Sequence, residues 1–134
     1  FLGGRARRCS CPEPADSRIS LQDSQGRFIA LNPAACQLAG LGMVTSAVAA
    51  DVNGDGRPDL IVTCEWGPLQ LLLNTGRGFT NATAAWGLDR YSGLWNGVAV
   101  GDFDGDGRLD IVASNWGQNS QYEVEYDATH PLRI

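Results

Sequence analysis

The sequence lacks lysine altogether, and all ten of its basic residues are arginines. Fifteen aspartates and glutamates give the chain a formal net charge of −5 at pH 7. No basic stripe alternates with aromatic residues, which is the pattern that holds a nucleic-acid backbone. We therefore expect no nucleic-acid partner.

Histidine is almost absent as well. His130 is the only one, and it precedes Pro131 in a segment that we expect to be a loop. A lone histidine in such a place is more often a surface residue than a general base. No G-x-S-x-G motif and no pairing of cysteine with histidine is evident. These absences give little support to an enzyme.

Long apolar runs are missing too. The longest, around residues 47–50, is far shorter than the ~20 residues that a helix needs to cross a bilayer. No signal-peptide pattern is present in these 134 residues, which says nothing against export. We expect no membrane span.

One nine-residue acidic motif, in contrast, is present twice. Residues 51–59 read DVNGDGRPD and residues 102–110 read DFDGDGRLD, with a carboxylate or amide at the same alternate positions. Calcium takes six to eight oxygen ligands, and such a loop offers side-chain oxygens at positions 1, 3, 5 and 9 with a backbone carbonyl at position 7. The glycines permit the tight turns that bring closely spaced ligands together. The predicted ligands of two calcium ions are Asp51, Asn53, Asp55, Asp59 and the Arg57 carbonyl in the first loop, and Asp102, Asp104, Asp106, Asp110 and the Arg108 carbonyl in the second.

The loops begin like an EF-hand but do not continue like one. An EF-hand has a bidentate glutamate at position 12 and helices on both sides, whereas position 12 here is Val62 or Ala113. Apolar, partly β-branched runs follow each loop and short apolar runs precede it, which predicts two strands of one sheet joined by each loop. The alternative is an Asp/Gly-rich hairpin turn without metal. Four carboxylates on the second loop would repel one another without a cation, so we favour metal.

The motif and its flanking strands resemble the FG-GAP or VCBS repeat, the calcium-binding blade unit of integrin-α-type β-propellers. Further segments resemble the cartilage-acidic-protein-like and ASPIC/UnbV-type proteins: Gly42-Met43-Val44-Thr45, Cys64-Glu65-Trp66-Gly67, Trp95-Asn96-Gly97-Val98-Ala99, Asn115-Trp116-Gly117 and His130-Pro131-Leu132-Arg133. The resemblance implies an all-β fold of tandem propeller-type blades. It says little about activity, because such folds serve mainly as scaffolds.

A shift of 51 residues superposes Phe28 on Phe79 and Asp51 on Asp102, a period typical of propeller blades. We predict four segments: an irregular N-terminal segment (1–17), a first repeat unit (18–67), a second unit (68–117) and a strand leading to a missing unit (118–134). Hairpin strands are expected at 18–21 and 27–31, a further strand at 69–73, and an alternating strand at 122–126.

About two units do not make a closed propeller, which needs about four or more blades. Unpaired strand edges are templates for pairing with another chain. The chain is therefore expected either to be a piece of a longer propeller or to assemble with further copies, head to tail, and an unclosed contact of that kind grows into a filament.

Cys9, Cys11, Cys36 and Cys64 form an even set, consistent with two disulfides in an oxidising compartment. Cys9 and Cys11 are too close to pair easily, so we expect each to bridge to Cys36 or Cys64. The alternative is four reduced thiols.

Seven of the fifteen acids lie in the two loops, and two divalent cations would change the formal charge from −5 to −1. All-oxygen sites of this kind bind weakly and work where calcium is plentiful, outside the cell. We expect a non-enzymatic, extracellular structural or adhesive module with a protein partner or its own copies. The alternatives are a lectin-like module that stacks glycans on Trp66, Trp86, Trp95 or Trp116, and, less favoured, a calcium-assisted polysaccharide hydrolase or lyase.

Overall fold

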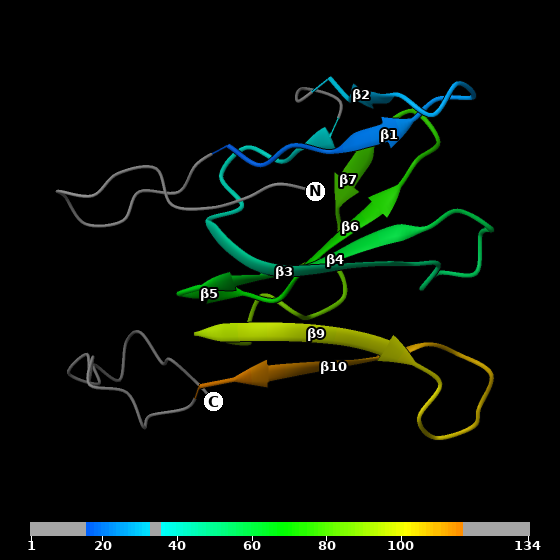
Figure 1. Ribbon diagram of the computed structural model, residues 1–134. Helices are drawn as coiled ribbons and strands as arrows, with labels where there is room; N and C mark the ends of the chain where they lie inside the picture. The colour runs from blue at the N-terminus through cyan, green and yellow to red at the C-terminus, as the bar shows by residue number, and fades with distance from the viewer. Residues whose placement is uncertain (1–15, 33–35, 117–134) are drawn as a thin grey trace, which may run out of the picture.

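The computed structural model describes residues 16–32 and 36–116 (Figure 1). Within these residues the chain is built from strands and turns, so the all-β prediction is confirmed. The strands are β1 (Ser20–Gln22), β2 (Phe28–Ala30), β3 (Met43–Ala50), β4 (Asp59–Glu65), β5 (Gly67–Pro68), β6 (Gln70–Asn74), β7 (Phe79–Asn81), β8 (Ser92–Gly93), β9 (Trp95–Gly101) and β10 (Asp110–Asn115). The sheets of the described region are open, as expected for a chain that is not a closed propeller by itself.

The central element is a four-stranded antiparallel sheet in the order β3-β4-β6-β7. One of its two middle strands, β4, contains an apolar, partly β-branched run, and all but its last residue is buried. Such a run is typical of a strand covered on both faces. Neighbouring layers must therefore cover the central sheet on each side.

Two antiparallel pairs supply this cover. Figure 1 shows the β1–β2 hairpin above the central sheet and the β9–β10 pair below it. The first core, which includes Leu60, Val62 and Leu72, is completed by Ile19 and Leu31 beside the hairpin. The second core, which includes Ile61 and Leu71, is completed by Val98, Val100 and Ile111 of the β9–β10 pair. Alternate residues of β4 thus face opposite cores.

An irregularity in β3 helps to join the layers. The register with β4 shifts between Val44 and Ser46, so Thr45 has no partner opposite it. The Thr45 hydroxyl donates to the backbone oxygen of Trp95, the first residue of β9, over 2.7 Å. A bulge of this kind turns a side chain away from its regular direction, and here it links the central sheet to the next pair.

The repeat seen in the sequence is also present in the strands. Phe28 begins β2 and Phe79 begins β7, and Asp59 and Asp110 begin β4 and β10, so both pairs are 51 residues apart. The predicted hairpin near the N-terminus is confirmed as β1–β2, and the strand expected at 69–73 is found as β6. The central sheet takes β3 and β4 from before the 67/68 division and β6 and β7 from after it. The four-stranded sheet therefore combines the second half of the first repeat unit with the first half of the second.

Several predictions fall outside the described residues: the segment before residue 16, the strand at 122–126, and the residues Cys9, Cys11 and His130. In the described part, Cys36 and Cys64 are buried free thiols, and no disulfide is found there. Burial raises the pKa of Cys64 to about 11, and a hydrogen bond from Gln70 only partly offsets this effect. The bridges expected at Cys36 and Cys64 are therefore not found in the described region, and their expected partners Cys9 and Cys11 lie outside it.

Candidate metal centre: the two acidic loops

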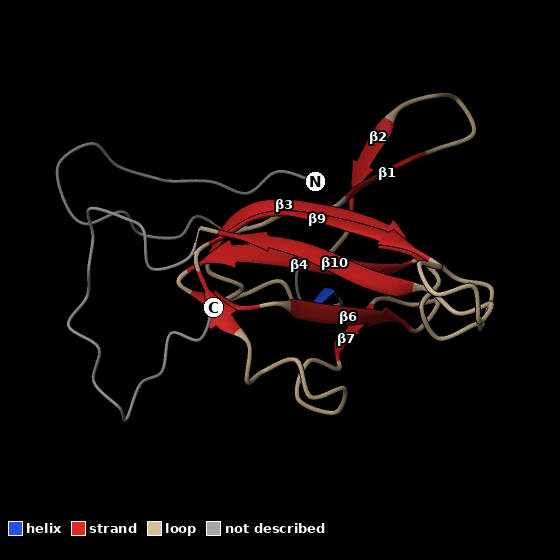
Figure 2. Cartoon of the chain, turned by 90° about the horizontal axis from the view of Figure 1, so that it is seen from below, coloured by secondary structure: helices blue, strands red, loops and turns tan. Residues whose placement is uncertain are grey.

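The two acidic loops occupy equivalent places in the fold. The first joins β3 to β4 and the second joins β9 to β10, each across an antiparallel pair. Both lie at the same end of the molecule in Figures 1 and 2. This confirms that each loop connects two strands of one sheet.

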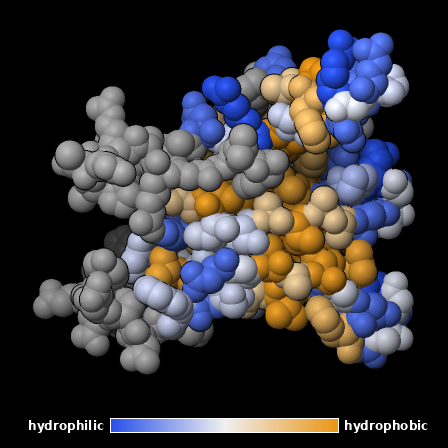
Figure 3. All heavy atoms as spheres, in the orientation of Figure 1, coloured by the Kyte–Doolittle hydropathy of each residue, from blue (hydrophilic) through white to orange (hydrophobic). Residues whose placement is uncertain are grey.

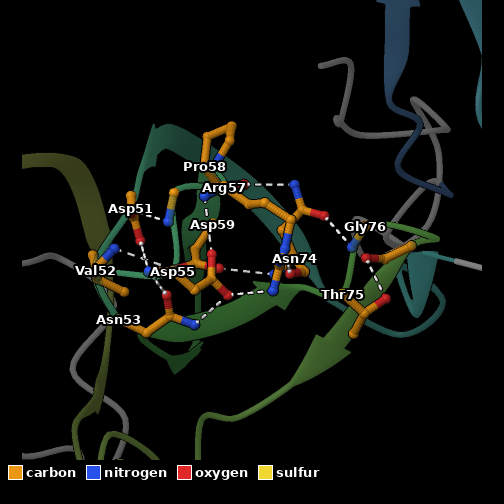
Figure 4. A network of polar contacts seen from close by, with 12 residues as sticks. Asp51, Val52, Asn53, Asp55, Arg57, Pro58, Asp59, Asn74, Thr75 and Gly76 are labelled. Atoms are coloured by element: carbon orange, nitrogen blue, oxygen red, sulfur yellow. Dashed lines mark hydrogen bonds and ion pairs between the residues drawn. The ribbon is translucent and has the colours of Figure 1, made fainter.

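In the first loop, Asp51 is the organising carboxylate. It accepts hydrogen bonds from the backbone N–H groups of Asp55 (3.0 Å) and Gly56 (2.7 Å). The Asn53 side-chain oxygen accepts from the same Asp55 N–H at 3.0 Å, and its amide nitrogen donates to Asp55 Oδ2 at 3.0 Å. Figure 4 shows these side chains turned toward one another inside the loop. The three predicted ligands at positions 1, 3 and 5 are thus brought together.

The second loop repeats this arrangement with one more carboxylate. Asp102 accepts from the N–H groups of Gly105 (2.7 Å) and Gly107 (2.9 Å), and Asp104 accepts from the N–H of Asp106 at 3.1 Å. One carboxylate oxygen each of Asp102, Asp104 and Asp106 can be chosen so that all three lie within 4.8 Å of one another. Among the described residues, this is the group of acidic side chains whose oxygens converge in this way.

This spacing fits one calcium ion. Oxygens bound at 2.3–2.6 Å to a common ion can be at most about 5 Å apart, so the three carboxylates need no large movement to share it. The donors are all oxygens, which suits a hard cation such as calcium better than zinc or copper. In the first loop, Asn53 replaces one carboxylate and contributes a neutral oxygen instead.

The carboxylates at position 9 have a different role in the structure from those at positions 1, 3 and 5. Asp59 is fully buried, and its two oxygens accept from the N–H groups of Val52 (3.1 Å) and Asn74 (2.8 Å). Asp110 accepts from the N–H of Phe103 at 3.0 Å. Each closes the base of its loop at the start of the following strand. Neither belongs to the converging trio described above.

Arg57 and Arg108, expected to offer backbone carbonyls, also act through their side chains. Their guanidinium groups pair with Asp55 and Asp106, both at 2.6 Å. Burial tends to raise the pKa of Asp55, but hydrogen bonds from Asn53 and Arg57, with the charge of Arg57, outweigh it and hold the pKa below the ordinary 3.8. Asp55 is therefore an ionised carboxylate at neutral pH.

Asn74 holds the first loop against β6, and no sequence pattern singles it out. It lies at the end of β6, where its N–H donates to Asp59, its side chain donates to the Pro58 oxygen at 3.0 Å, and its own oxygen accepts from Arg57 Nε at 2.9 Å. Figure 4 shows it alongside the loop. An asparagine before a glycine turn is an ordinary strand end, and only the pairing of β4 with β6 brings it to the loop.

The four tryptophans, which the lectin-like alternative assigns to glycan stacking, differ in exposure. Trp95 is half-buried, and its indole N–H donates to the Gly67 oxygen at 3.1 Å. Trp66, Trp86 and Trp116 are exposed.

Within the described part of the chain, no helix is long and apolar enough to cross a bilayer.

Comparison with known proteins agrees with this geometry. The family model for the FG-GAP-like repeat matches residues 51–113, which contain both acidic loops. Mouse cartilage acidic protein 1 is 34% identical over 95 residues, which are 70% of this chain and 14% of the mouse protein. Human cartilage acidic protein 1 is 38% identical over 77 residues, which are 57% of this chain and 10% of the human protein. The chain thus matches only a small part of these relatives. No solved structure matches. The resemblance inferred from the motifs is confirmed: residues 51–113 carry FG-GAP-like repeat sequence, in an all-β chain of propeller-type blades.

Proposed function

We propose that this FG-GAP-like repeat chain is a non-enzymatic, calcium-stabilised structural or adhesive module that works outside the cell. The observation that carries the proposal is the convergence of Asp102, Asp104 and Asp106 in a loop whose counterpart in the first repeat has the same fold. When bound, calcium would supply positive charge to each cluster of oxygens. Asp51 and Asp102 fix the conformation of their loops, because each accepts hydrogen bonds from backbone N–H groups of its own loop.

Calcium binding would act mainly on stability. A site with a dissociation constant near ~10⁻⁴ M, in free calcium near ~10⁻³ M, adds about 1.4 kcal/mol to the free energy of unfolding. Two such sites together would matter for a chain with small, open sheets. Sites of this affinity would fill only where calcium is high, so an extracellular location is part of the proposal. The name of the two relatives, which refers to cartilage, is consistent with this.

The exposed apolar side chains support a surface function. The converging carboxylates of the described residues belong to the candidate calcium loop. Large apolar side chains are exposed at both ends of the molecule, among them Phe28 at one end and Phe103 and Val112 at the other. Exposed apolar surface is typical of interaction sites. Protein contacts are therefore the favoured use of this module.

The calcium proposal is tested by thermal unfolding of the chain and of Asp104→Ala, each with millimolar calcium and with excess chelator. We expect the wild type to melt higher in calcium, and Asp104→Ala to lose about 1.4 kcal/mol of that gain while melting like the wild type in chelator. Calorimetric titration should give two calcium ions for the wild type and one for the variant. Asp89→Ala, an exposed aspartate outside both loops, is the matched control. An equal loss for Asp104→Ala in both solutions would show that the residue has no metal role.

Glycan binding is the second candidate, favoured by the exposure of Trp66, Trp86 and Trp116. Exposed indoles offer apolar faces on which sugar rings stack. This function predicts that a bound oligosaccharide protects tryptophan fluorescence from quenching, whereas a purely protein-binding module shows no such protection.

A further inference from the structure

The two ends of the molecule expose positions that the middle of the molecule buries. Val112 holds in β10 the place that Ile61 holds in β4, because the two residues are one repeat of 51 residues apart. Ile61 is 0% exposed, whereas Val112 is 54% exposed. At the other end, Phe79 of β7 packs against the first core, whereas its counterpart Phe28 in β2 is 73% exposed. Each end of the molecule therefore exposes an apolar residue whose counterpart in the central sheet is covered.

The central sheet contains the strand pairing that the two ends of the molecule lack. There β4 pairs with β6, with Leu60 opposite Leu72, Ile61 opposite Leu71 and Val62 opposite Gln70. Polar contacts tie the same two strands together, because Arg57 Nε and the Asp59 carboxylate both bind the backbone of Asn74. This joint unites a strand that follows an acidic loop with a strand that begins a hairpin.

The described residues contain a second strand of each kind, and these two strands are not paired with each other. β10 follows the second acidic loop, as β4 follows the first, and in the described residues it pairs only with β9. β1 begins a hairpin, as β6 does, and within the described part of the chain it pairs only with β2. The hairpin registers set Gln22 opposite Phe28 and Asn74 opposite Phe79, so β1 and β6 differ by 52 residues because the first turn is one residue longer.

We propose that β10 of one molecule pairs with β1 of a second copy of this chain, and that the joined strands form a four-stranded sheet in the order β9-β10-β1-β2. Adding 51 to the β4 positions and subtracting 52 from the β6 positions gives the register. Ile111 lies opposite Ser20 of the second copy, Val112 opposite its Ile19, and Ala113 opposite its Arg18. The inference rests on the proposed function of a β-repeat module and names its partner.

The faces of this joined sheet match. Residues directly opposite in an antiparallel pair lie on the same face, so Val112 joins Ile19 of the second copy. Within its own molecule Ile19 packs against the first core. Val112 and Phe103 would therefore be covered by the second copy's first core, as Ile61 and Val52 are covered by the second core here. The pairing continues an interface that the chain already contains between its own layers.

Charge at the strand ends favours the same partner. The side chain of Arg57, which binds the Asn74 oxygen, is 46% exposed, whereas that of Arg108 is 85% exposed. In the proposed register, Arg108 comes beside the Gln22 oxygen of the second copy and next to the Asp23 carboxylate that follows it. Arg108 already pairs with Asp106, and Asp23 with Arg27. The proposed contact would give the exposed Arg108 guanidinium group a backbone oxygen as a further acceptor.

The contact is head to tail, because β10 and β1 are different surfaces. Hydrophobic surface is visible in Figure 3 at the lower end of the molecule, where Figure 1 places β9 and β10. Each copy would hold one complete sheet and share one more, so a ring of three copies would contain about six sheets, within the usual range for propellers. A contact that does not close would give a filament.

The test is sedimentation velocity of the 134-residue chain in calcium, from low micromolar to near-millimolar concentration. We expect the mass to rise from 14.3 kDa to at least twice that value as concentration increases. Val112→Arg and Phe28→Asp should each abolish self-assembly. Trp86→Arg, an exposed residue in the connection between β7 and β8, should assemble like the wild type. Circular dichroism checks that each variant is folded.

Mixing the two defective variants distinguishes this contact from other self-association. Val112→Arg keeps an intact β1–β2 end and Phe28→Asp keeps an intact β10 end, so the mixture should form dimers and nothing larger. A monomeric mixture, a monomeric wild type at every concentration, or full assembly of Val112→Arg would overturn the proposal. So would assembly that occurs only after residues 117–134 are removed, since the edge would then belong to the chain's own C-terminal segment.

Calcium titration of the same samples separates the two proposals. A chain that binds calcium but stays monomeric would refute the pairing and leave the calcium-stabilised module standing. A chain that assembles through these edges without binding calcium would do the reverse.

Discussion

Asp59 supports the first acidic loop at its base. It is fully buried and accepts one backbone N–H from its own loop and one from the end of β6. Hydrogen bonds to a charged group are worth about 1.5–3 kcal/mol each, and a buried donor without a partner costs a similar amount. Its counterpart Asp110 is only half-buried and accepts one N–H from its loop. The same residue type at the same motif position therefore contributes differently to the stability of the two loops.

We predict that Asp59→Asn lowers the free energy of unfolding by about 2 kcal/mol in chelator, because the amide keeps one acceptor oxygen and leaves one buried N–H unpaired. Asp110→Asn, the matched control, should lose less than about 1 kcal/mol, since its remaining oxygen can still accept from Phe103. Urea denaturation at low protein concentration measures both. Equal losses would mean that burial of Asp59 does not decide its contribution.

At the scale of elements, each acidic loop is a turn whose backbone is fixed by glycine. Gly54, Gly56, Gly105 and Gly107 have positive φ angles between +75° and +84°, in the left-handed region. A side chain in this region costs roughly 1–2 kcal/mol for residues other than glycine. A Cβ atom added at any of the four positions would meet no neighbouring atom within 4 Å, so a clash would not add to this cost.

Gly56→Ala is therefore expected to destabilise the chain by about 1 kcal/mol, through backbone strain alone. The loss should be seen in chelator as well as in calcium, because the strain does not require the metal. Gly97→Ala in β9 is the control, since that glycine lacks a positive φ and an added Cβ would meet only the Ser114 hydroxyl at 3.4 Å. Thermal melts of both variants decide the point: a loss for Gly97→Ala as large as that for Gly56→Ala would contradict it.

At the scale of the whole molecule, the layers are held together by the two faces of one sheet. Alternate residues of β4 and β6 enter the first and the second core, so the central sheet is the common element of both. Leu71 is fully buried in the second core, which also includes residues of the β9–β10 pair. The attachment of that pair depends on this packing and on the Thr45 contact with Trp95.

Leu71→Ala should lower the free energy of unfolding by about 2–5 kcal/mol, the usual cost of truncating a buried leucine. Leu21→Ala, at an exposed leucine of β1, should change it by less than about 0.5 kcal/mol. Urea denaturation gives the totals, and hydrogen exchange should show the β9–β10 amides losing protection first. Unchanged protection there would argue against the second core as the link between layers.

Local chemistry let the sequence determine much of this protein by itself. Alternating oxygens and glycines predicted both loops, the apolar runs beside them predicted β3, β4, β9 and β10, and the 51-residue period predicted the repeat. Each of these signals depends on residues close together in the chain. That the predicted ligand side chains at positions 1, 3 and 5 of each loop lie close together follows from the same local turn.

The tertiary structure alone decided the rest. Asn74 reaches Asp59 only because β4 pairs with β6, and the sheet straddles the repeat because its edges are set by hydrogen bonds between strands far apart in the sequence. The same holds for exposure. Ile61 and Val112 have the same place in the repeat, yet one is covered by a neighbouring layer and the other is not. Burial depends on what packs against a residue, and a linear pattern does not contain that information.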